Sequence, residues 1–209
     1  VTTSRNDDHG TNALRRMEVS TNAKLEQLER HRIKSEFILV EWNPPADRPL
    51  LKDVLSWPEK SKYCTVRTFV VPPPIHQRYE HWDKMPINVI VAFNCGIRRA
   101  HGQFVLPGNM DLFYSEELMA YLAAKSLKEH ERYRIDRCDV PSNVLHYDTL
   151  GKQLDFCRRN IIHTHTHGSP SRRESLPYLH TNACGDFQLM SRYYWHLLRG
   201  YCETSVLST

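Results

Sequence analysis

Short apolar runs and longer amphipathic stretches alternate along the chain. The runs at 37–40, 66–71 and 103–106 are bounded by polar residues, which predicts buried strands. Residues 12–32 and 87–99 place apolar side chains at helical spacing, which predicts amphipathic helices. Strands and helices that alternate in this way indicate an α/β fold with a mostly parallel central sheet and helices on both faces.

The first helix and the second half of the chain complete this pattern. In 12–32 an apolar face is predicted from Leu14, Met17, Leu25 and Leu28, with Arg, Lys and Glu side chains elsewhere. Residues 161–182 are long, polar and turn-rich, which predicts a loop. Further helices are predicted at 50–57, 150–159, 193–198 and from a Ser115 cap, and further strands at 132–140 and 187–190.

Length and composition indicate a single domain with a packed core. The 209 residues are 40% hydrophobic, and 28 Lys and Arg against 24 Asp and Glu give a net charge of +4. The two signs are interspersed, which does not indicate a nucleic-acid polymer as partner. The longest apolar run, 118–124, is far shorter than the roughly 18 residues of a transmembrane helix.

The cysteines indicate a cellular compartment, and the chain ends indicate whether the sequence is a fragment. Six cysteines are scattered without a C-x-x-C pair, which favours a reducing, cytoplasmic compartment and leaves peripheral attachment to a membrane open. Val1 begins the sequence without a signal peptide and runs directly into a polar cluster. We therefore expect a fragment that is truncated at both ends.

Polar residues follow three of the predicted strands. In a parallel sheet such strand ends gather at one edge, where ligands bind. The sequence has no Gly-rich dinucleotide turn and no P-loop, so a phosphate bound here would need a metal. Asp111 is the candidate ligand for Mg²⁺ or Mn²⁺, because hard cations prefer oxygen ligands. The alternative is that Asp111 only begins the turn before the Ser115 helix.

Several segments, taken together, resemble a glycosyltransferase signature. Residues 94–106 with 109–111 resemble the N-x-G-I-x-x-A-x-G-E-[FY] segment and the following D-x-D of GT-A-fold enzymes similar to family 2. Residues 183–192 with 199–203 resemble the acceptor-side motif of these enzymes, which ends in G-[FY]-x-E. The ends of the first two predicted strands also match, so the resemblance covers nearly the whole chain in family order.

The resemblance implies a Rossmann-like GT-A fold that transfers a sugar from a nucleotide-diphosphate sugar to a glycan, lipid or protein acceptor with Mn²⁺ or Mg²⁺. It implies one domain over 1–209, with a nucleotide-binding half at 1–114 and an acceptor-side half at 115–209. The nucleotide-sugar-binding residues it indicates are Arg5, Asn6, Asp8, Glu41, Asn94, Arg98 and Asn109, with Asp111 as metal ligand and Asp186 and Glu203 as catalytic candidates.

Two departures from the family pattern support an alternative function. Asn109 stands where the first Asp of D-x-D is usual, and an amide offers only a neutral oxygen to a cation. The general base of many relatives follows the G-[FY]-x-E motif, whereas this sequence ends at Thr209. Asp186 therefore ranks first as base, ahead of Glu203. The alternative is a catalytically inactive sugar-nucleotide or glycan-binding module.

A histidine run suggests a third function. His163, His165 and His167 would share one side of a strand and could bind Zn²⁺ or Ni²⁺, which would make the chain a His-loop metal-binding protein. The polar surroundings favour a solvated loop instead. Trp42 is open to two interpretations, stacking on a base or sugar and packing in the core.

Overall fold

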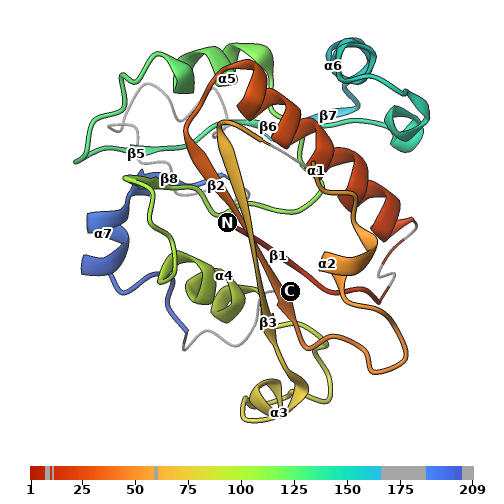
Figure 1. Cartoon of the computed structure of the whole chain (residues 1–209), viewed down its shortest axis with the longest axis vertical. Helices are drawn as coiled ribbons and strands as arrows, with labels where there is room; N and C mark the ends of the chain where they lie inside the picture. The colour runs from red at the N-terminus through yellow and green to blue at the C-terminus, as the bar shows by residue number, and fades with distance from the viewer. Residues whose placement is uncertain (8–9, 11, 59–60, 166–186, 204–209) are drawn as a thin grey trace, which may run out of the picture.

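The computed structural model describes residues 1–7, 10, 12–58, 61–165 and 187–203 (Figure 1). In chain order the elements are β1 (Thr2–Ser4), α1 (Ala13–Arg30), β2 (Ser35–Trp42), α2 (Leu51–Val54), β3 (Cys64–Val71), α3 (Pro73–His76), α4 (Val89–Ile97), β4 (Phe104–Val105), α5 (Glu116–Ala123), β5 (Arg132–Tyr133), β6 (Arg137–Asp139), the 3₁₀ helix η1 (Ser142–His146), α6 (Leu150–Arg159), β7 (His163–His165), β8 (Leu189–Ser191) and α7 (Arg192–Leu197).

A parallel sheet with the order β1-β2-β3 forms the centre of the first half. Both faces of this sheet are covered, because alternate side chains of β2 enter two different cores. Ile38 and Val40 pack with α4 on one face, and Phe37 and Leu39 pack with α1 on the other (Figure 1). This double burial explains why the strand is a continuous apolar run. The prediction of helices on both faces is confirmed for this sheet.

Backbone hydrogen bonds join residues 106–108 to the start of this sheet. The Val1 nitrogen donates to the Leu106 carbonyl at 2.8 Å, and the Gly108 N–H donates to the Val1 carbonyl at 3.0 Å. One residue that bonds to two positions separated by two is the pattern of parallel pairing. The chain therefore passes Val1 in the direction of β1 and carries Asn109–Asp111 toward the carboxyl-terminal edge of the sheet.

The remaining strands pair antiparallel, so the parallel part is smaller than predicted. β8 lies between β4 and β5, and β6 pairs with β7. The predicted strand 132–140 is two strands in different sheets, and β7 lies inside the predicted loop 161–182. Backbone pairing with β6 stabilises β7, although its sequence is polar. The chain is a mixed α/β protein in which two of the five strand pairings among the described residues are parallel.

Capping residues set the starts of several helices. The Ser115 hydroxyl accepts a hydrogen bond from the Leu118 N–H, as predicted, with Glu116 and Glu117 in the first turn of α5. Asn12, the residue before α1, takes a left-handed conformation with φ 56° and makes no capping bond through its side chain. None of the helices in the described ranges is long and apolar enough to cross a membrane.

Candidate functional site

Lys24 of α1 holds the turn that carries the predicted metal ligand. Its side-chain nitrogen donates to the carbonyls of Asn109 at 3.1 Å and Met110 at 2.7 Å, and it lies 5.8 Å from the centre of the Tyr114 ring. The residue is 4% exposed. Burial lowers the pKa of Lys24 to about 7, and the negative charge of Asp111 acts in the opposite direction. A buried amino group therefore fixes the backbone beside Asp111.

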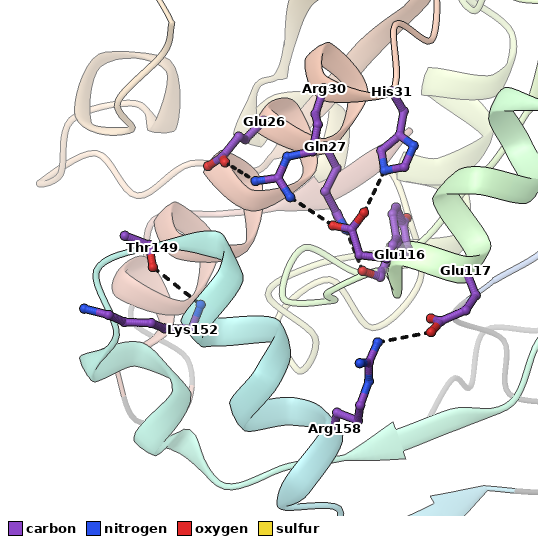
Figure 2. Close-up of polar contacts among 10 residues, drawn as sticks. Glu26, Gln27, Arg30, His31, Glu116, Glu117, Thr149, Lys152 and Arg158 are labelled. Atoms are coloured by element: carbon purple, nitrogen blue, oxygen red, sulfur yellow. Dashed lines mark hydrogen bonds and ion pairs between the residues drawn. The ribbon is translucent and has the colours of Figure 1, made fainter.

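Other side chains at α1 also form hydrogen bonds to residues 109–116, which we call the 109–116 segment. The Ser20 hydroxyl also donates to the Met110 carbonyl, and the Gln27 amide donates to the Tyr114 carbonyl at 2.7 Å. At the end of the helix, Arg30 and His31 both contact the Glu116 carboxylate, at 3.2 and 2.8 Å (Figure 2). These contacts come from positions 20, 24, 27 and 31, which recur every three or four residues. They therefore lie on one face of α1, and this face holds the 109–116 segment.

The predicted metal ligand Asp111 lies at the edge of a cleft of about 780 Å³, together with Asn109. The Asp111 side chain is 39% exposed, and its Oδ2 lies 3.1 Å from Nη1 of Arg16. The cleft is lined largely by apolar side chains, including Leu112, Phe113, Leu118, Val144, Leu154 and Phe187. Its volume falls within the range of small-molecule pockets.

Two of the residues that line this cleft form an ion pair with each other. Glu117 of α5 lies 3.1 Å from Arg158 of α6, and both line the cleft (Figure 2). The two side chains are 72% and 66% exposed, so the contact is solvated and contributes little to stability. The pair adds one charge of each sign to a lining that also contains the charged residues Arg16, Asp111, Glu116, Asp136, Arg137 and Asp139.

The described residues around Asp111 do not by themselves form a complete site for a divalent cation. Among the residues that the structure describes, no three or more His, Cys, Asp or Glu side chains are grouped so that they could hold a metal ion. Asp111 offers a single carboxylate, and Arg16 contacts it. Mg²⁺ commonly binds through one or two carboxylates and completes its shell with substrate phosphates and water. The donor set therefore fits a cation bridged by substrate, not one held by protein alone.

Arg5 and Asn6 follow β1 at the carboxyl-terminal edge of the sheet, where the sequence predicted nucleotide contacts. Arg5 pairs with Asp7 at 3.3 Å and donates to the Pro86 carbonyl, also at 3.3 Å. The Asn6 amide donates to the Pro49 carbonyl at 2.9 Å. Asp8, predicted beside them, lies outside the described residues. These side chains order the loops at this edge.

Glu41 lies at the end of β2, next to Ser4 of β1. It is 2% exposed, and its Oε2 accepts a hydrogen bond from the Leu51 N–H at 2.8 Å. Burial raises the pKa of the Glu41 carboxyl above its ordinary value. The Glu41 carboxyl group thus holds the start of α2 at the edge of the sheet. The sequence did not indicate this contact.

The structure brings together residues from two separated motifs at the end of α4. The Asn94 amide donates to the Tyr201 carbonyl at 2.9 Å and to Glu203 at 2.8 Å, and accepts from the Tyr201 N–H at 2.8 Å. Arg98 donates to the same Glu203 oxygen at 2.7 Å. Gly200 has φ +83°, and a Cβ there would lie 2.2 Å from Asn94 Oδ1. Residues 199–203, the 199–203 turn, thus close tightly on α4.

The predicted site residues therefore fall into three groups: Arg5, Asn6 and Glu41 at the sheet edge; Asn109 and Asp111 at the cleft; and Asn94, Arg98 and Glu203 at the 199–203 turn. The catalytic candidate Asp186 lies outside the described residues. Sequence reasoning missed Lys24, because it assigned the charged residues of 12–32 to the side away from the core. Its spacing from Met17 and Leu28, at i+7 and i−4, places it on the apolar face and was the available signal.

The surroundings of Trp42, His163 and Cys95 do not indicate a binding or catalytic role. Trp42 is 1% exposed and donates to His76 at 2.8 Å, so it packs in the core. His163 is exposed on β7 opposite Asp139, and His167 lies outside the described residues. Burial raises the pKa of the Cys95 thiol, which disfavours the nucleophilic thiolate.

Comparison of the chain with protein-family models, with curated proteins and with solved structures finds no match.

Proposed function

We propose that this chain is a glycosyltransferase domain that uses a nucleotide-diphosphate sugar and a divalent cation. The observation that carries the proposal is the position of Asp111 on a fixed turn, beside the carboxyl-terminal edge of a parallel sheet and in the lining of a cleft. Ligands of open α/β sheets bind outside this edge. The motif resemblance supplies the reaction class.

Asp111 is the residue that would hold the cation, and the bound cation would neutralise charge on the departing diphosphate. Arg16, 3.1 Å from Asp111, is placed to contact the diphosphate once the carboxylate is engaged. Arg5, Asn6 and Glu41 would form the base-binding edge with their loops. Positioning and charge stabilisation would supply most of the acceleration.

Asp186 remains the first candidate for the general base, and the contacts of Glu203 favour this ranking. One Glu203 oxygen accepts hydrogen bonds from both Asn94 and Arg98. These two donors occupy the oxygen, so the hydroxyl of an acceptor would have to compete with them to reach it. A second function follows if Asp186 does not face the acceptor: a nucleotide-sugar-binding module without turnover, which Asn109 in place of an acidic residue also favours.

Transfer and hydrolysis assays with UDP-, GDP- and dTDP-sugars in Mn²⁺ test the proposal. We expect turnover of at least one donor, its loss in Asp111→Ala, and a reduction of about 10² to 10⁴ in Asp186→Asn. Asp148→Asn is the matched control, since this exposed carboxylate pairs with Lys152 on α6. Binding without turnover would favour the inactive module, and absence of nucleotide binding would contradict both functions.

A further inference from the structure

Lys24 is a buried amino group in the middle of α1, and its neighbours suggest a role beyond packing. We propose that Lys24 is a positioning residue that fixes the turn at Asn109–Asp111, so that the Asp111 carboxylate faces the cleft. The proposal rests on the proposed function, because it assigns to Asp111 the cation and diphosphate described above. Nothing in the sequence motifs points to Lys24.

The partners of Lys24 indicate what it holds. Lysine is almost never fully buried without a partner. Here the two hydrogen bonds go to backbone carbonyls, those of Asn109 and Met110, and the face of Tyr114 lies on a further side. Replacement by an apolar side chain would remove this donor from the half-buried Asn109 carbonyl and would leave the buried Met110 carbonyl with the Ser20 hydroxyl, which is unfavourable. The site is therefore specific for a side chain that donates at this depth.

The two carbonyls define the position of Asp111. The Asn109 carbonyl belongs to the peptide plane before Met110, and the Met110 carbonyl belongs to the plane that contains the nitrogen and Cα of Asp111. Fixing both planes leaves little freedom in the φ and ψ angles of Met110. The Met110 side chain adds an anchor, since it is 5% exposed and packs in the core with α1.

Arg16 and Lys24 act on different parts of Asp111 and its turn. Arg16 contacts the carboxylate itself at 3.1 Å, and this contact must loosen when a cation binds there. Lys24 holds only the backbone, and its contacts are compatible with either state of the carboxylate. We therefore expect Lys24 to act through Asp111 on cation-dependent binding, without touching the nucleotide.

The test is calorimetry of UDP and GDP with the whole chain, in Mn²⁺ and in chelator. We expect Lys24→Met to weaken Mn²⁺-dependent affinity at least tenfold, the usual size of effects that act through a metal ligand, and to leave chelator affinity unchanged. In an Asp111→Asn background, Lys24→Met should cause no further loss. The control is Gln153→Met, because Gln153 is also buried and donates to a carbonyl, that of Tyr147 at 2.9 Å.

Additive effects of Lys24→Met and Asp111→Asn, or Mn²⁺-dependent affinity retained within twofold in Lys24→Met, would overturn the positioning role. If the wild-type chain binds neither nucleotide, the proposed function fails, and amide hydrogen exchange then decides the role of Lys24 separately. Exchange at residues 110–114 should rise at least tenfold in Lys24→Met and stay unchanged in Gln153→Met. Equal exchange in both variants would overturn the proposal.

Discussion

The 109–116 segment and the 199–203 turn are both irregular stretches fastened to a helix by side chains, but they leave their acidic residues in different states. Around Asp111 the first is held by α1 through the backbone carbonyls of residues 109 and 110, and the Asp111 carboxylate contacts only the side chain of Arg16 among the contacts described above, beside a cleft. The second is held by α4, and its carboxylate at Glu203 is itself one of the fastenings. Fastening through the backbone leaves a side chain available to a ligand.

This difference separates two kinds of substitution. Changes at the 199–203 turn should lower stability, since its polar groups bond to Asn94 and Arg98 at the end of α4. Changes at Asp111 should alter ligand binding, since an exposed ion pair contributes little to folding. The predictions below test that division, from the largest expected effect on stability to the smallest.

Asn94→Ala should lower the free energy of unfolding by about 3 kcal/mol, because it removes hydrogen bonds to both the backbone and Glu203 from a fully buried position. Urea denaturation measures this change. The control is Asn160→Ala, which removes one amide bond to a carbonyl from an exposed site and should cost less than about 1 kcal/mol. Equal losses would show that the 199–203 turn is not firmly attached to α4.

Stability should rise with pH above neutrality through Lys24. Folding lowers the pKa of Lys24 from 10.5 to about 7, so the unfolded chain binds more protons between these values. From pH 7 to pH 9 the wild-type chain should therefore gain roughly 2 kcal/mol relative to Lys24→Met. Parallel urea titrations of the two proteins measure the difference. A constant difference across this range would contradict a depressed pKa in the folded state.

Arg98→Ala should have the smallest effect, about 0.5 kcal/mol, because its ion pair with Glu203 joins side chains that are 54% and 35% exposed. Asn94 keeps Glu203 in place without it. Thermal unfolding measures the loss, and nucleotide titration of the same variant tests the predicted role of Arg98 in nucleotide-sugar binding. A loss as large as that of Asn94→Ala would mean that charge, and not the amide, holds the 199–203 turn.

Local signals in the sequence predicted the regular elements well. The boundaries of α6 and the Ser115 cap follow from helical period and capping chemistry, which act within a few residues. The polar strand β7 could not be predicted this way, because its stability comes from pairing with β6. The single strand predicted over 132–140 divides for the same reason: its two ends pair with different partners.

Sequence motifs indicated candidate site residues but not the contacts that these residues make. Sequence motifs indicated Asn94, Arg98 and Glu203, yet their meeting depends on how a turn about 105 residues later packs on α4. The helical spacing of Lys24 could have indicated its burial, but its partners could not be predicted, because they are backbone carbonyls 85 and 86 residues away. Asp111 is a candidate from the sequence because a carboxylate near a strand end is itself a chemical signal, and its role as a metal ligand stays a prediction.

The most direct test of a cation-bridged diphosphate at Asp111 is titration calorimetry of UDP and GDP in Mn²⁺ and in chelator, for the wild-type chain, Asp111→Ala and Asn109→Asp. We predict that Mn²⁺ strengthens binding of at least one nucleotide to the wild-type chain, that Asp111→Ala abolishes this gain, and that Asn109→Asp keeps or increases it by adding a second charged oxygen. Identical diphosphate affinity with and without Mn²⁺ would contradict the account.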